Sequence, residues 1–144
     1  MAGAGDVVRA WADALDRGDL EGSHEFVAPD VEWANPVASV RGAAELRALL
    51  DAFWTAIPDF QHSLTAVLEE GALVAVEGVA HGTHTGPLVG PMGEIPATGK
   101  RVEFPFAAWA RVEDGKIRRF RGYWDLAGFM AQLGLAPEPA AAHA

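Results

Sequence analysis

Residues 101–124 read RVEFPFAAWARVEDGKIRRFRGYW, and this stretch decides the fold. Apolar residues recur at alternate positions on both sides of the EDG sequence at 113–115, which is typical of two strands joined by a turn. The pattern predicts strands over 101–112 and 116–124. Pro105 cannot donate a hydrogen bond to a neighbouring strand, so we expect a sheet edge or a bulge there.

The stretch before this hairpin has the same two-residue period. It predicts strands over 60–68 and 73–85, with Glu70-Gly71 turning the chain between them. Residues 86–99 (GPLVGPMGEIPATG) hold too many glycines and prolines for regular structure, and we expect an irregular loop.

The first half of the chain has helical spacing instead. Apolar residues three to four apart predict a helix that is capped by Asp6 and ends near Gly18, and two more over 19–28 and 42–57. A short strand at 31–35 and a last helix at 125–133 complete the pattern.

This order of elements predicts the α+β class: a curved antiparallel sheet wrapped around N-terminal helices, forming a cone with an apolar pocket. We expect one domain over residues 1–135, followed by a disordered tail at 136–144.

Composition narrows the class of protein. The chain has 144 residues and a net charge of −9, which argues against a nucleic-acid partner. It has no cysteine, no signal-peptide pattern and no apolar run of about 18 residues, so we expect a cytoplasmic protein away from the membrane. Motifs of metal, phosphate or nucleotide sites are absent, and we expect neither a metal nor a cofactor.

Asp125 is the first candidate for chemistry. It follows Tyr123 and Trp124 and precedes Leu126, so apolar neighbours would strip water from the carboxyl group and raise its pKa into the range useful for proton transfer. The competing interpretation is that Asp125 is the N-cap of the last helix.

His84 and Asn35 are the other catalytic candidates. His84 stands near a strand end and can polarise a carbonyl or relay a proton, although a hydrogen-bonded structural histidine is the simpler reading. Asn35 precedes a proline; its amide can donate to an enolate oxygen, but asparagine commonly builds a turn at such a place.

Aromatic residues are abundant, with five Trp and seven Phe against one Tyr. An ordinary core accounts for many of them, but several should face an apolar ligand such as a polyketide or polyene. The expected substrate-binding residues are Trp33, Phe53, Trp54, Phe104, Trp109, Arg121 and Tyr123. Five of the eleven basic residues lie between positions 111 and 121, either as a solvated sheet face or as a rim for an anionic substrate or carrier protein.

Several segments together resemble the SnoaL-like polyketide cyclases, which share the nuclear-transport-factor-2-like fold. They are RGYWD at 121–125 with QLG at 132–134, GTHTG at 82–86, PATGK at 96–100, WANP at 33–36 and IPD at 57–59. The resemblance covers about residues 5–135. It implies a cofactor-independent cyclase of antibiotic biosynthesis, a lyase or isomerase that closes a carbon ring.

By the same resemblance, Asp125 matches the acid–base aspartate of the aldol closure, and Asn35 and His84 match residues that contact substrate oxygens. Arg111 stands near a position where aromatic-polyketide cyclases have a histidine, and a guanidinium cannot replace a neutral imidazole. The substrate and the reaction can therefore differ from the aldol closure.

Other activities stay open. A shaped apolar pocket could template a cycloaddition without proton transfer. An epoxide-opening cyclase or hydrolase would need a second carboxylate, with Asp59 and Glu103 as candidates, and a non-catalytic binding protein is the remaining class. A homodimer is expected in each case, and a transient carrier-protein contact is a further possibility.

Overall fold

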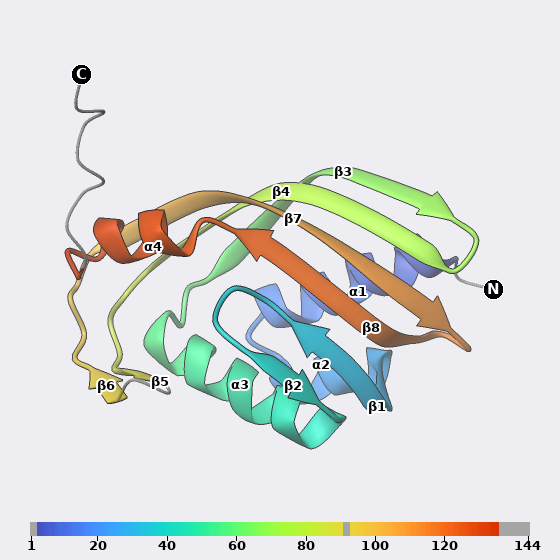
Figure 1. Cartoon of the computed structure of the whole chain (residues 1–144), viewed down its shortest axis with the longest axis horizontal. Helices are drawn as coiled ribbons and strands as arrows, with labels where there is room; N and C mark the ends of the chain where they lie inside the picture. Colours follow the sequence, from blue (N-terminus) through green and yellow to red (C-terminus); the bar gives the residue numbers. More distant parts are fainter. Residues whose placement is uncertain (1–2, 91–92, 136–144) are drawn as a thin grey trace.

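A six-stranded sheet with the strand order β2-β1-β8-β7-β4-β3 curls over two helices (Figure 1). The computed structural model describes residues 3–90 and 93–135. The helices are α1 (Ala4–Asp16), α2 (Leu20–Ser23), α3 (Ala43–Ala56) and α4 (Leu126–Gln132), and a 3₁₀ turn spans His24–Phe26. The strands are β1 (Val27–Ala34), β2 (Ser39–Arg41), β3 (Gln61–Glu70), β4 (Leu73–Thr83), β5 (Leu88–Gly90), β6 (Gly93–Ile95), β7 (Arg101–Glu113) and β8 (Lys116–Trp124).

The predicted α+β fold with a curved sheet is confirmed. All neighbouring strands are antiparallel except β1 and β8, which run parallel. The long helices α1 and α3 pack on the concave side, α1 against β3, β4, β7 and β8, and α3 against β1 and β2. Among the described residues, no helix covers the convex face of β4, β7 and β8 (Figure 1).

Alternation along the strands builds the core. In β7, Val102, Phe104, Ala108, Ala110 and Val112 are buried, and their neighbours on the opposite face are exposed or half-buried. Ala108, Ala110 and Val112 belong to the cluster that includes the apolar side of α1, whereas Val102 and Phe104 belong to a second cluster with Ile57 and Phe129. These contacts remove apolar area from water, which is the main favourable term in folding.

The C-terminal end of α3 packs closely against the segment that follows β4. The backbone N–H groups of Thr85 and Gly86 both donate to the Ala56 carbonyl, at 3.1 and 3.0 Å. A Cβ atom on Gly86 would lie 2.1 Å from the Thr55 carbonyl oxygen, which no side chain could tolerate. Glycine is therefore required at position 86 by close backbone approach.

Several local expectations need correction. Residues 86–99 are not wholly irregular, because β5 and β6 pair as a small antiparallel hairpin within them. The first helix is capped at Gly3, and Asp6 instead accepts from the Gly3 N–H at 3.2 Å. The strand expected at 31–35 begins at Val27. The expected tail at 136–144 lies outside the described residues.

Pro105 lies within β7, just beyond the last β7–β8 pair, Phe106 with Trp124. Pro105 still pairs with Val79 of β4, so β7 is an edge at this position only on the side of β8.

His84 pins the loop before β7 to the end of β4. Its side chain is fully buried, and its Nδ1 lies 2.9 Å from the Thr98 hydroxyl and accepts from the Thr98 N–H at 3.2 Å. Backbone bonds join His84 to Lys100 and Gly99. Burial lowers the pKa of His84, and a backbone hydrogen bond with Gly86 opposes the shift in part.

The lowered pKa of His84 makes folding stability depend on pH. The unfolded chain takes up a proton near pH 6.5, whereas the folded chain resists it, so the stability present above that pH is lost as the pH falls below it. We expect the melting temperature to fall less between pH 7.5 and 5.5 in His84→Gln than in the wild type. His81→Gln is the control, and equal slopes in wild type and His84→Gln would contradict the prediction.

Candidate active site

An aromatic cluster lines the part of the concave face that lies near α4. Phe53 and Trp54 of α3 contact Phe60 edge-on, with ring centroids 4.8 and 5.4 Å apart. Phe104 contacts Trp124 at 5.3 Å and Phe129 at 5.6 Å. Three of the expected substrate-binding residues, Phe53, Trp54 and Phe104, therefore belong to one apolar cluster.

A second aromatic group lies under β1 and β8. Trp33 stacks on Phe120, with centroids 3.8 Å apart and planes at 7°, and Trp11 of α1 lies 5.1 Å from Trp33. The indole nitrogens of Trp11, Trp33 and Trp54 are buried without a hydrogen-bond partner among the described residues. A buried N–H without a partner costs about 1–3 kcal/mol, so these indoles are unused donors in the interior.

Asn35 builds the turn between β1 and β2 and still keeps a free donor. Its Oδ1 accepts from the backbone N–H groups of Val37 and Ala38, both at 2.9 Å, which is the turn expected from the sequence. The carbonyl half of the amide is therefore occupied. No described residue accepts from its Nδ2, which remains able to donate.

Gly122 lies beside Asn35 on the sheet. It is on the inward face of β8, between Phe120 and Trp124, and pairs with Ala108 of β7. A Cβ on Gly122 would lie 3.2 Å from the Phe120 ring and 3.8 Å from the Asn35 Cβ, so glycine lets Phe120 pack closely over the strand beside Asn35. The amide of Asn35 therefore borders the aromatic residues at this point of β8.

Asp125 does not lie in an apolar hollow, and that expectation is wrong. The residue is exposed, because it continues the outward-facing positions of β8. Its Oδ1 accepts from the Gly128 N–H at 2.9 Å, so Asp125 is the N-cap of α4. Neither of the two surface hollows described below is lined by Asp125.

Three expected substrate-binding residues face outward instead of inward. Tyr123 is 55% exposed, Arg121 is exposed, and Trp109 packs beside Ala75 on the convex face. The reason is the two-residue period: Trp109 alternates with buried Ala108 and Ala110, and Arg121 with inward Phe120.

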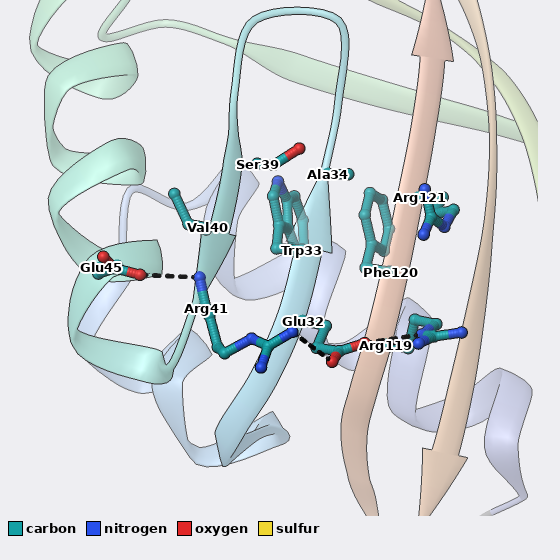
Figure 2. Close-up of a pocket in the computed structure, with 10 residues that line it drawn as sticks. All are labelled: Glu32, Trp33, Ala34, Ser39, Val40, Arg41, Glu45, Arg119, Phe120 and Arg121. Atoms are coloured by element: carbon teal, nitrogen blue, oxygen red, sulfur yellow. Dashed lines mark hydrogen bonds and ion pairs between the residues drawn. The ribbon is translucent and has the colours of Figure 1, made fainter.

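A hollow of about 320 Å³ lies at the β2–β1–β8 end of the sheet. Figure 2 shows the charged side chains that line it, among them Glu32, Arg41 and Arg119. Glu32 lies between Arg41, at 3.1 Å, and Arg119, at 2.6 Å. The hydrogen bond and charge of Arg119, with the charge of Arg41, lower the pKa of Glu32. Among the described residues, Arg121 makes no ion pair and is the unneutralised cation of this hollow.

A second hollow of about 350 Å³ lies on the convex face. Its lining is mostly apolar and consists of Leu68, Glu69, Glu70, Leu73, Val74, Ala75 and Trp109.

A histidine–aspartate pair was not foreseen. His62 Nδ1 lies 2.7 Å from Asp16 Oδ1, and both side chains are largely buried. Asp16 lies 46 residues from His62 in the sequence, and no local pattern identifies the pair.

The other acidic candidates do not form a carboxylate pair with Asp125 in the interior. Asp59 is exposed and accepts from the Thr83 N–H at 2.7 Å, and exposed Glu103 pairs with Arg101 at 3.3 Å. Within the described part of the chain, no three His, Asp or Glu side chains are grouped to hold a metal ion. No described helix is both long and apolar enough to cross a membrane.

The comparisons with known proteins agree with this architecture. The family model of SnoaL-like polyketide cyclases matches residues 5–133. The chain is 32% identical over 135 residues to the aklanonic acid methyl ester cyclase DnrD of Streptomyces peucetius, covering 90% of this chain and 89% of that protein. It is 34% identical over 137 residues to the corresponding cyclase DauD of Streptomyces sp. (strain C5), covering 90% and 80%.

Among solved structures, the chain resembles IdmH of Streptomyces antibioticus, described as a candidate polyketide cyclase. The TM-score is 0.75 at 27% identity, covering 91% of this chain and 98% of that one. The resemblance inferred from the sequence segments is therefore confirmed: the chain belongs to the SnoaL-like polyketide cyclase family.

Proposed function

We propose that this chain closes a ring in an apolar polyketide intermediate that it holds against the concave aromatic face. The observation that carries the proposal is the amide donor of Asn35, which no described residue occupies, beside Gly122 in a chain of the polyketide cyclase family. The half-buried rings of Phe53, Trp54 and Trp124 supply an apolar surface, which suits a flat polyketide. Aklanonic acid methyl ester, the compound named for two relatives, is the first substrate to test.

In this mechanism Asn35 stabilises developing charge. Ring closure of the aldol type begins with removal of a proton next to a carbonyl, and the electron pair moves to the carbonyl oxygen. The Nδ2 of Asn35 can donate to that oxygen, since its Oδ1 is held by the turn. A fixed donor in an apolar site stabilises the charge without reorganisation.

Substitution of Asn35 by Asp removes the side-chain N–H donor but keeps the oxygen that accepts hydrogen bonds in the turn. The carboxylate oxygen can still accept from Val37 and Ala38, but the N–H donor is lost. We expect Asn35→Asp to lower kcat on the order of 10²–10³ with a melting temperature close to the wild type. Steady-state kinetics and thermal unfolding measure the two effects, and an unchanged kcat would remove Asn35 from the mechanism.

Asp125 is proposed as an acid–base group at the outer end of the site. Because its carboxylate is exposed and caps α4, it can reach a substrate only if that substrate extends past Trp124 to the helix N-terminus. Cycloaddition on the same aromatic surface is the alternative that needs no carboxylate.

A pair of variants tests Asp125 directly. Asn is also a good N-cap, so Asp125→Asn should retain stability, whereas Asp125→Ala should lose about 1 kcal/mol. If Asp125 transfers a proton, both variants lose on the order of 10²–10⁴ in rate. A loss in Asp125→Ala alone would show that Asp125 acts only through the helix cap.

We also propose that the convex face binds a second copy of this chain. Leu68 is 70% exposed and Leu73 is 42% exposed, and both border the apolar hollow beside Trp109. The same face carries Arg111 and Glu77, so a twofold arrangement can bring opposite charges together.

Arg121, which makes no ion pair with a described residue, is the proposed contact for an anionic substrate group or an acidic carrier protein.

Charged substitutions on this face test the dimer. We expect the wild type to sediment as a particle of twice 15.2 kDa, and Leu68→Glu combined with Leu73→Lys to sediment as a monomer. Val89→Glu is the matched control, because Val89 is 57% exposed on the β5–β6 hairpin, away from this face. A wild-type monomer at micromolar concentration would contradict the proposal.

A further inference from the structure

The pair formed by His62 and Asp16 has the geometry of an oriented base. Asp16 is the last residue of α1, and its Oδ1 accepts from the His62 backbone N–H at 3.1 Å and lies 2.7 Å from His62 Nδ1. Gln61 Nε2 donates to the Asp16 carbonyl at 2.6 Å. Three contacts therefore fix the end of α1 against the start of β3.

This contact determines which ring nitrogen is free. A carboxylate only accepts hydrogen bonds, so Nδ1 carries the hydrogen and the lone pair of the neutral ring is on Nε2. Nε2 makes no hydrogen bond to a described residue, and the protein does not fully enclose it. The His62 side chain is 18% exposed, so the ring is held but remains accessible.

The surroundings of the ring belong to the concave site. His62 lies edge-on to Phe60, with centroids 4.9 Å apart, and to Phe106 at 5.5 Å, and it lies 6.2 Å from Trp54. Phe106 is the backbone partner of Trp124 across β7 and β8, and Gly122 lies two residues before Trp124. His62 and Asn35 therefore lie on the same, inward face of the sheet.

We propose that His62, oriented by Asp16, is the catalytic base of the concave site and takes the acid–base role in place of Asp125; this rests on the proposed cyclase function. Nε2 takes the proton from the carbon next to a carbonyl, and the C–H electron pair moves to the oxygen near Asn35. The enolate carbon then bonds to the second carbonyl carbon, whose π electrons go to its oxygen. The protonated imidazole returns the proton to that alkoxide, so no other reactant is required.

The charged neighbours of His62 are few. Asp16 is the group that α1 offers; α3 and β7 contribute the aromatic rings of Trp54 and Phe106. On β4, His81 lies opposite Gln61, on the other face of the sheet from His62. Asp16 is therefore the charged group in direct contact with the His62 ring.

Kinetics with aklanonic acid methyl ester tests the base. We expect His62→Gln to lower kcat on the order of 10²–10⁴, and Asp16→Asn to cause a smaller loss. His81→Gln, which changes a histidine of the neighbouring strand, should behave as the wild type. A wild-type kcat in His62→Gln would overturn the assignment while leaving the cyclase function intact.

A second measurement needs no turnover. Diethyl pyrocarbonate acylates accessible neutral imidazole nitrogens, and peptide mass spectrometry locates each adduct. We expect His62 to react at Nε2 in the folded wild type, His84 to stay unmodified, and Asp16→Asn to slow the reaction at His62. An unreactive His62 would overturn this inference whether or not the wild type turns over the ester. Failure of the wild type to turn over the ester would instead count against the proposed function.

Discussion

The two-residue period of β8 is the constraint on which the rest of the structure depends. This strand is parallel to β1 on one side and antiparallel to β7 on the other, so two ladders fix its register. Phe120, Gly122 and Trp124 consequently face the helices, and the residues between them face outward. A slip of one residue would exchange these two sets, which is why the buried face holds the register so firmly.

Sequence periodicity predicted the elements well but not the face that each residue occupies. Helical and strand spacing placed α3, β7 and β8 within a few residues, because their apolar patterns are long. Trp109, Arg121 and Tyr123 were nevertheless assigned to a pocket. An aromatic residue on a strand fits either face, and only the pairing with β4 and the position of α1 decide which face is covered.

The candidate site shows a different limit. Local chemistry correctly indicated both the cap at Asp125 and the turn at Asn35, since each depends on atoms within three residues. Asp125 is exposed because it continues the outward-facing positions of β8, and its apolar neighbours in the sequence do not reveal this. The partner of His62 was equally hidden, because Asp16 reaches it only after α1 has packed against β3.

The two histidines of the interior differ in how fully the protein encloses them. His84 lies where Thr98 occupies Nδ1 and the protein encloses Nε2, so a proton can reach it only if the loop opens, and burial lowers its pKa. His62 has one nitrogen held by a carboxylate and the other accessible beside the aromatic rings. A base must both exchange protons and keep its orientation, and of these two histidines only His62 satisfies both requirements.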